Sequence, residues 1–389
     1  MSNRKLAETF PIAPLKIIAM EGSKSIGEKV NRCIVDTRKA AMEGFEEVPP
    51  YIDYDKESYI VDYSVPRFGT GEAKGVINET IRGCDVFLIS DFMNYSNTYK
   101  MFGEESMKSS DDHFQDLKRI IATCKIAKAK RITVIMPFLY ESRQHGRTTL
   151  ESLDAANALQ ELSDMGVENI ITFDAHDPRV QNAIPIRGFD NFYTSYQFIR
   201  ELFSSEPDLV IDKENLMVIS PDEGGMTRAV YYANVLGVEM GMFYKRRDYS
   251  VIENGRNPIV AHEFLGSSVK DKDVFIVDDM ISSGESMLDV ARELKKRGAR
   301  RVFVAATFGL FCNGLEKFDE YYEKGYITRI LTTNLIYSTD ELLSRPYYTN
   351  VDLSRYIGLI INTLNHDTSV NDIINPAQLI SDLVIAHKR

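Results

Sequence analysis

The sequence predicts an α/β protein of two domains, each built on a mostly parallel, doubly wound sheet with flanking helices. Three observations predict this fold class. Strand-like apolar runs alternate with helical segments along the chain, which is typical of βαβ units. The strand runs are mostly uninterrupted Ile, Val and Phe, as expected for strands covered on both faces. A length of 389 residues is enough for two separate cores.

The apolar runs predict strands at 15–20, 85–90, 131–138, 169–174, 216–220, 238–243, 274–277, 301–307 and 329–333. Apolar residues at helical spacing predict helices over 114–127, 286–297 and 376–387. Two stretches, 44–65 and 91–112, lack such a pattern and are expected to be surface excursions. The order of the strands suits two domains, at 1–190 and 191–389.

Composition excludes several functional classes. The formal net charge is −11, which disfavours binding to nucleic acids or anionic membranes, because both need a basic surface. The sequence has no run of 18 apolar residues, and its first residues lack the apolar core of a secretory signal. The cysteines at 33, 84, 124 and 312 are widely spaced and form no CxxC pair. We therefore expect a cytoplasmic protein with reduced thiols.

The strongest chemical signal is the segment VFIVDDMISSGES at 274–286. Asp278 and Asp279 follow an apolar strand, where adjacent carboxylates can bind the 2- and 3-hydroxyls of a ribose or approach a metal. The turn after them offers hydroxyls and backbone N–H groups to a phosphate at the positive end of a helix. In open α/β sheets, ligands bind at this carboxyl end of the strands. An ordinary βα turn with a Ser cap is the alternative, but the Asp pair beside the strand favours a binding site.

Three further patterns follow predicted strands. His176 lies between two Asp residues, so its imidazole could bind a metal or a phosphate. Asp222 is followed by Gly224 and Gly225, which permit close approach of the backbone to a ligand. The basic run 245–247 supplies the local positive charge that an acidic chain needs for an anionic substrate. Each pattern alone is more typical of an ordinary loop, turn or solvated face.

Together these segments resemble a known family. The loop at 274–286 resembles the phosphoribosyl-binding loop of type I phosphoribosyltransferases, and the other motifs narrow the resemblance to the ribose-phosphate diphosphokinases (phosphoribosyl-diphosphate synthetases). Those motifs occur in the family's order and at near-family spacing, at 67–72, 142–144, 173–176, 220–225 and 244–247. The resemblance extends from about residue 15 to residue 370. It implies two tandem phosphoribosyltransferase-like domains and Mg²⁺-dependent transfer of the diphosphate of ATP to ribose 5-phosphate.

The resemblance also implies a role for each matching residue. The ATP-binding residues would be Phe68, Thr70, Glu72, Arg143, Gln144 and His176. The ribose 5-phosphate-binding residues would be Asp278, Asp279, Ser282, Ser283, Gly284 and Ser286. The metal would be held by His176 and Asp222, and the catalytic residues would be Lys245, Arg247 and His176. In the family, the basic pair lies on a flexible loop that closes over the transferring diphosphate; here the pair precedes the polar stretch 248–258, which is expected to be a mobile loop.

Family members take the adenine-contacting turn, here 68–72, from a neighbouring subunit. The resemblance therefore implies a homo-oligomer built from dimers, of which a hexamer is one candidate. ATP and ribose 5-phosphate are the expected small-molecule partners.

The chain departs from the family pattern at three places. Arg143-Gln144 is followed by His145-Gly146-Arg147, where Asp and a Lys-rich stretch are usual. The ribose-phosphate loop has Ser282 in place of Asp and Glu285 in place of a common Gly. The two insertions and the C-terminal extension lengthen the chain. A non-catalytic regulatory homologue and a phosphoribosyltransferase therefore remain as alternatives, although the second would leave the N-terminal motifs without a task.

Overall fold

The computed structural model describes residues 9–43, 53–247 and 259–388, and the chain divides into two compact units. Unit one combines the chain up to Tyr193 with residues 334–337 and 352–375. Unit two combines residues 194–333 and 338–351 with the C-terminal segment from Pro376. The domain boundary expected at residue 190 lies close to Tyr193, where the chain first passes from unit one to unit two. The chain then returns to unit one twice.

Unit one is built on a five-stranded sheet in which every neighbouring pair is parallel. In spatial order its strands are β1 (Leu15–Ala19), β4 (Asp85–Ile89), β7 (Arg131–Ile135), β8 (Asn169–Phe173) and β9 (Gly188–Phe192). The first four confirm predicted strands. The sequence analysis missed β9, because its run GFDNF is short and partly polar and pairs only at the edge of the sheet.

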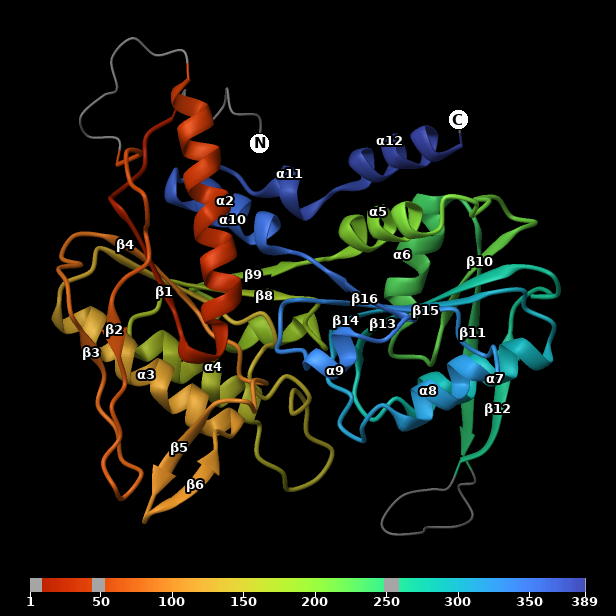
Figure 1. Ribbon diagram of the computed structural model, residues 1–389, viewed down its shortest axis with the longest axis horizontal. Coiled ribbons are helices and arrows are strands. Elements are labelled where there is room, and N and C mark those ends of the chain that lie inside the picture. Colours follow the sequence, from red (N-terminus) through yellow and green to blue (C-terminus); the bar gives the residue numbers. More distant parts are fainter. Residues whose placement is uncertain (1–8, 44–52, 248–258, 389) are drawn as a thin grey trace. The chain divides into compact units, whose positions relative to one another are not determined.

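Helices cover both faces of this sheet (Figure 1). They are α2 (Lys24–Met42), α3 (Ser110–Ile126), α4 (Asp154–Asp164), α10 (Ser354–Asn365) and α11 (Asn371–Ile374), with 3₁₀ turns η1 (Glu21–Ser23) and η2 (Pro178–Ala183). Helices α3 and α4 lie on one face, and α2 and α10 on the other. The late helix α10 is tied to α2 by the buried Arg38, which donates to Asn362 Oδ1 (2.8 Å) and Asn365 Oδ1 (2.7 Å).

The insertions are less external than predicted. Residues 44–52 lie outside the described part, but Tyr54 and Tyr59 are buried, and Ile17 of β1 exchanges backbone hydrogen bonds with Tyr59 and Val61. The predicted surface excursion is therefore wrong over 59–61, where the chain extends the edge of the sheet beside β1, whereas residues 55–58 are exposed as predicted. Two short antiparallel pairs complete the unit: β2 (Tyr63–Ser64) with β3 (Val76–Ile77), and β5 (Thr98–Met101) with β6 (Glu104–Met107).

Unit two is built on a seven-stranded sheet. In spatial order its strands are β12 (Ile259–Leu265), β11 (Glu239–Arg247), β10 (Leu216–Ser220), β13 (Asp273–Ile281), β14 (Val302–Gly309), β15 (Arg329–Thr333) and β16 (Tyr348–Val351). Only the β11–β12 pair is antiparallel among these pairings. Pairing with β12 makes β11 longer than predicted, so the basic run at 245–247 ends this strand instead of following it.

The helices of unit two are α5 (Ser195–Ser205), α6 (Met226–Leu236), α7 (Glu285–Lys296), α8 (Glu316–Glu323), α9 (Asp340–Leu343) and α12 (Ala377–His387). Figure 1 shows α7 and α8 on one face of the sheet and α5, α6 and α12 on the other. The helices predicted over 286–297 and 376–387 are confirmed as α7 and α12. Of the helices in the described ranges, none is long and apolar enough to cross a bilayer.

The two sheets share one topology. The order β1-β4-β7-β8-β9 in unit one corresponds to β10-β13-β14-β15-β16 in unit two, with parallel pairing throughout both series. In each unit the first of these strands leads into a helix, α2 or α6, and the second leads to α3 or α7. The fold is therefore the predicted pair of tandem α/β domains with related, mostly parallel sheets.

Candidate functional site

The Asp pair lies at the carboxyl end of β13. Asp279 is buried, with 6% of its surface exposed, and its backbone N–H donates to Asp278 Oδ1 at 2.9 Å. Burial, and then the neighbouring charge of Asp279, raise the pKa of Asp278. The guanidinium of Arg228 on α6 lies 3.6 Å from Asp278 Oδ1 and opposes this shift. Two carboxylates this close repel each other, so hydrogen-bond donors or a cation bound next to them would be stabilising.

The turn after the pair depends on one glycine. Gly284 has φ of +81° and caps the N-terminus of α7. A Cβ at this position would lie 2.1 Å from the ring of Phe318, so only glycine fits there without displacing α8. The first turn of α7 therefore begins directly beyond the Asp pair. Backbone N–H groups at such a helix start bind phosphate.

The two residues of this turn that depart from the family pattern, Glu285 and Ser282, both have partners in the structure. Glu285 Oε1 lies 3.0 Å from Lys317 Nζ on α8, in an exposed ion pair. The carboxylate that replaces the family's glycine is therefore engaged by a lysine, which lowers its cost beside a phosphate site. Ser282 Oγ lies 3.8 Å from Cys312 Sγ, and its carbonyl accepts from the Cys312 N–H at 3.0 Å. Ser283 is half-buried and Ser286 exposed.

Asp222 approaches the Asp pair from the neighbouring strand. Its Oδ1 accepts the N–H groups of Gly224 (3.0 Å) and Gly225 (3.3 Å), which closes the turn between β10 and α6. A Cβ on Gly225 would lie 2.9 Å from Ser220 Oγ, so this turn also needs glycine. The negative charge of Asp222 contributes to the raised pKa of Asp278. The structure therefore brings the predicted sugar and metal carboxylates of unit two to one edge of its sheet.

A second group of predicted residues lies at the carboxyl ends of β7 and β8 in unit one. Each of the two loops contains a non-glycine residue with positive φ, Glu141 (56°) and Asp174 (41°). Such residues are held by the surrounding structure and are frequent at functional sites. Arg143 and His176 are exposed. Gln144, by contrast, turns back on its own loop, where Nε2 donates to the Ser152 carbonyl at 2.8 Å.

His145, which departs from the family pattern, belongs to this group. Its ring lies 5.3 Å from that of His176, between centroids, and its Nε2 lies 3.6 Å from Asp177 Oδ2. Hydrogen bonds from Arg179 lower the pKa of Asp177 to about 2. No role was predicted for His145, although its place after Arg143-Gln144 was a signal that could have indicated one. Arg228, which follows the Asp222 turn closely, was likewise not predicted.

The predicted adenine turn has a separate anchor. Phe68 is 55% exposed, and its N–H donates to the Glu72 carbonyl at 2.7 Å. Thr70 Oγ1 donates to Glu72 Oε2 at 3.0 Å. Arg67 holds the turn in place. It donates to the Gly71 carbonyl at 2.9 Å, and its guanidinium lies 4.1 Å from the centroid of the Tyr99 ring. The turn thus presents an exposed aromatic ring on a braced backbone.

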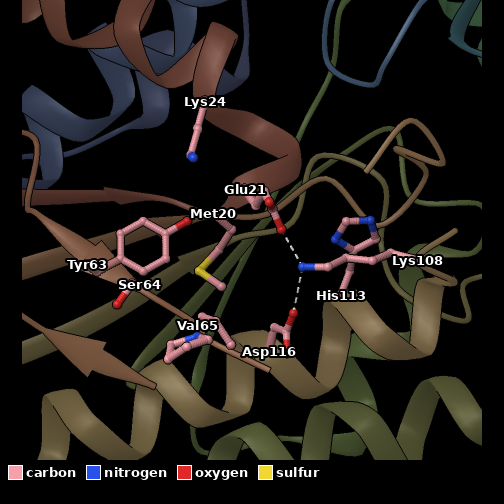
Figure 2. A pocket seen from close by; sticks show the side chains of 10 residues that line it. Met20, Glu21, Lys24, Tyr63, Ser64, Val65, Lys108, His113 and Asp116 are labelled. Carbon is pink, nitrogen blue, oxygen red and sulfur yellow. Dashed lines mark hydrogen bonds and ion pairs between the residues drawn. The ribbon is translucent and has the colours of Figure 1, made fainter. Parts of the chain in front are cut away.

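Asp116, which pairs with Arg67, also lines a cavity (Figure 2). Asp116 on α3 accepts from Arg67 (2.9 Å), Arg119 (2.7 Å) and Lys108 (3.0 Å). Lys108 is buried and pairs on its other side with Glu21. The cavity measures about 270 Å³, and its lining includes Met20, Glu21, Lys24, Tyr63, Lys108 and Asp116. No predicted site residue lines it, and its paired charges brace the start of α3.

The structure describes little of the residues predicted to be catalytic or to bind a metal. The side chains of Lys245 and Arg247, and the loop 248–258, lie outside the described part of the structure. No three or more His, Cys, Asp or Glu side chains gather around one point in the described ranges. His176 is exposed after β8 in unit one, and Asp222 is half-buried after β10 in unit two. Mg²⁺ is commonly held by one or two carboxylates together with substrate phosphates, so a sparse protein donor set fits it.

Comparisons with known proteins agree with this architecture. Residues 15–166 match the model of the N-terminal domain of ribose phosphate pyrophosphokinase, and residues 189–339 match the phosphoribosyl transferase domain. The ribose-phosphate pyrophosphokinase of Vibrio parahaemolyticus is 28% identical over 81% of this chain and 91% of its own. That of Haemophilus ducreyi is 29% identical over 79% and 89%.

A solved structure has the same fold. Phosphoribosylpyrophosphate synthetase from Mycobacterium smegmatis superposes with a TM-score of 0.70 at 19% identity, over 91% of this chain and 99% of that one. Both domain models, in the family's order, together with the relatives that match most of the chain, lead to one conclusion. The chain belongs to the ribose-phosphate pyrophosphokinase family.

Proposed function

We propose that this protein is a ribose-phosphate diphosphokinase. It transfers the β,γ-diphosphate of ATP to the 1-hydroxyl of ribose 5-phosphate, giving 5-phosphoribosyl 1-diphosphate and AMP. The observation that carries the proposal is the Asp278–Ser286 segment, in which a carboxylate pair leads directly into a glycine-capped helix start. Family membership and the presence of the nucleotide-side motifs in unit one support the same activity.

In this proposal, unit two binds the sugar phosphate. The 5-phosphate accepts hydrogen bonds from the backbone of 283–286 and from the hydroxyls of Ser282, Ser283 and Ser286. Asp278 and Asp279 accept the 2- and 3-hydroxyls of the ribose. Arg228 favours the ionised form of Asp278, whose oxygens can accept both a backbone N–H and a sugar hydroxyl.

Unit one supplies the nucleotide groups. Arg143 and His176 are exposed at the carboxyl ends of β7 and β8, where they can contact the phosphates of ATP. Phe68 is proposed to contact adenine in a neighbouring subunit, together with Thr70 and Glu72, which makes a homo-oligomer part of the site. His176 in unit one and Asp222 in unit two are each proposed as a ligand of Mg²⁺ with phosphate oxygens, and the ion would supply charge neutralisation at the diphosphate.

The reaction needs positioning and charge stabilisation. The 1-hydroxyl oxygen of the sugar attacks the β-phosphorus, the bond between that phosphorus and the α,β-bridging oxygen breaks, and AMP leaves with that oxygen. The hydroxyl proton passes to solvent or a nearby base. Lys245 and Arg247 are proposed to stabilise the negative charge on the transferring group, as cations do in phosphoryl transfer.

One assay tests the activity and separates its rivals. Purified protein is incubated with ATP, ribose 5-phosphate and Mg²⁺, and AMP and 5-phosphoribosyl 1-diphosphate are measured. Stoichiometric formation of both supports the proposal. A regulatory homologue would bind ATP without forming AMP, whereas a phosphoribosyltransferase would consume 5-phosphoribosyl 1-diphosphate when given a base. Either result would replace the proposed activity.

Lys245→Ala tests the catalytic assignment. A group that acts only on the transition state lowers kcat and leaves both KM values nearly unchanged. We expect kcat to fall by about 10²–10³-fold, as for other preorganised charge-stabilising groups. Arg246→Ala is the control, expected to change kcat by less than tenfold. Similar small effects at both positions would identify a solvated basic strand end instead.

A further inference from the structure

The topology of unit one creates a ligand position that no predicted residue occupies. After β1 the chain passes through α2 to residues 59–61, which run parallel to β1 on one side, where Ile60 pairs with Ile17. Strand β4 lies on the other side of β1 and leads through α3 to β7. The sheet therefore extends in opposite directions from β1 and β4. In open α/β sheets, ligands bind at the carboxyl ends of strands at such a switch point.

Unit two has the same plan around its proposed ribose-phosphate site. Strand β10 leads through α6 to β11 on one side, and β13 lies on its other side and leads through α7 to β14. The second strands also correspond in sequence, as DVFLISD at 85–91 and DVFIVDD at 273–279. In each segment the first Asp pairs with an arginine beside the next strand, Arg131 at 2.8 Å and Arg301 at 2.7 Å. The two units therefore have equivalent switch points.

The cavity of Figure 2 lies at the switch point of unit one. Its lining includes Met20 and Glu21, which follow β1, and His113 and Asp116 from the first turns of α3. Glu21 is the second residue after β1, as Asp222 is the second after β10. The cavity volume of about 270 Å³ suits a small ligand, because pockets for drug-sized ligands measure about 300–1,000 Å³.

The groups around this cavity differ from those of unit two. The counterpart of Asp279 is Asp91, whose carboxylate accepts the backbone N–H groups of Met93 (2.8 Å) and Tyr337 (2.7 Å). The start of α3 is closed by a capping box between Ser109 and Asp112. Both groups are thus engaged within unit one. A ligand of this cavity has to be held by other side chains.

The charges around the cavity leave one cation over. The buried Lys108 lies between Glu21 and Asp116, 3.0 Å from the second, and Asp116 is also paired with two arginines. Lys24 extends from the start of α2 toward the cavity (Figure 2), and it forms no ion pair with any residue in the described ranges. The cavity therefore attracts an anionic group to Lys24. Glu21, held by Lys108, keeps lone pairs that can accept a hydroxyl.

We propose that this cavity binds a small sugar phosphate, with its phosphate at Lys24 and a sugar hydroxyl at Glu21. Lysine is a compact charge with three donors that binds phosphate well. A phosphate ion alone would not use Glu21, and a neutral sugar would not use Lys24. The choice of a sugar phosphate also rests on the proposed function of the equivalent point in unit two; the anion site at Lys24 does not.

Equilibrium dialysis of radiolabelled ribose 5-phosphate against the full chain, without ATP, tests the proposal. We expect two molecules bound per chain in the parent and one in Lys24→Gln, whose remaining site is that of unit two. Loss of a hydrogen bond from a charged group lowers affinity by about ten- to a hundredfold. Lys24 is exposed, so its replacement leaves the core of unit one intact.

Lys39→Gln is the matched control. Lys39 is an exposed lysine in the last turn of the same helix, away from the residues that line the cavity, so this variant should bind two molecules per chain. One molecule per chain in the parent, or two in Lys24→Gln, would overturn the proposal. Inorganic phosphate should compete for the Lys24-dependent site at least about tenfold more weakly than ribose 5-phosphate. Equal competition would overturn the proposal by identifying a simple anion site.

Asp279→Asn keeps the two proposals distinct. This change weakens the site of unit two and should leave the Lys24-dependent binding of ribose 5-phosphate in place. Such binding in a protein that forms no AMP would sustain the new site while removing the proposed function. Formation of AMP by a protein whose ribose 5-phosphate binding does not depend on Lys24 would do the reverse.

Discussion

The ribose-phosphate loop of unit two and the nucleotide loops of unit one are built by different means. The first is one continuous segment, 278–286, whose shape depends on Gly284 packed against Phe318. The second draws on separate stretches with exposed side chains, 143–145 and 176–177, and on the turn 68–72, which is proposed to act in a neighbouring subunit. We expect a substitution in the single strand–turn–helix segment to disturb its whole site, whereas a substitution in one of several separate loops should leave the other loops in place. The chain departs from the family pattern on both sides, at 145–147 beside the nucleotide residues and at 282 and 285 in the ribose-phosphate loop.

The largest expected effect tests this rigidity at Gly284. In Gly284→Ala the methyl group must displace Phe318 and the residue must keep positive φ, which costs about 1–2 kcal/mol before any clash. Misplacement of a binding loop by about 1 Å commonly costs about 100-fold, so we expect kcat/KM for ribose 5-phosphate to fall at least that much. Steady-state kinetics measure it, with circular dichroism as a check of folding.

Gly146→Ala is the matched change on the nucleotide side. A Cβ there meets nothing within 4 Å, so the effect should stay within about 0.5 kcal/mol, or roughly twofold. Equal losses at Gly284 and Gly146 would remove the contrast between a rigid and a tolerant loop.

The next effect concerns selectivity between the substrates. Asp279→Asn should raise KM for ribose 5-phosphate by about ten- to a hundredfold, because a hydrogen bond to a charged group is worth about 1.5–3 kcal/mol. KM for ATP should change little. Glu285→Gln, in the same loop but paired with Lys317, should change KM for ribose 5-phosphate by twofold or less, since exposed ion pairs contribute about 0–1 kcal/mol. Equal weakening of both substrates in Asp279→Asn would instead indicate a structural or metal role.

A smaller effect is expected on the nucleotide side. Phe68→Ala should raise KM for ATP by about tenfold, since stacking of a base on an aromatic ring is worth about 1–3 kcal/mol. Activity of the parent should also fall on dilution, because Phe68 is proposed to act in a neighbouring subunit. Phe102→Ala, a change at a more exposed aromatic residue, is the control. A fully active monomer in sedimentation experiments would contradict the proposed role of Phe68.

The smallest effect is on stability and depends on pH. The pKa of Asp278 is raised in the folded protein, so above about pH 4 the unfolded chain releases this proton first and ionisation favours unfolding. The parent therefore loses stability as pH rises toward the raised pKa. Asp278→Asn does not titrate at this site, so its free energy of unfolding should exceed that of the parent by at least about 1 kcal/mol at high pH. Denaturant unfolding across pH measures this, and a difference that does not grow with pH would contradict the raised pKa.

Much of the candidate site could be predicted because its signals are local. The Asp278–Asp279 pair and Gly284 share one strand–turn–helix, so a single apolar run fixes where they lie along the chain. Asp222 was predicted for the same reason. His145 and Arg228 could not be assigned, because their roles depend on side chains from other segments: His145 on Asp177 and His176, and Arg228 on Asp278. The roles of Lys245 and Arg247 stay predictions.

The sequence by itself determined the fold class, the central strands and the ribose-phosphate loop, because apolar periodicity and a glycine turn are encoded within a few neighbouring residues. Only the tertiary structure decided the edge strands, the burial of Tyr54, Tyr59 and Val61, and the return of α10 to unit one. Edge strands and returning helices are stabilised by partners far along the chain, as Arg38 is by Asn362 and Asn365. Such contacts leave no periodic trace in the segments that make them, so they become visible only when the chain is folded.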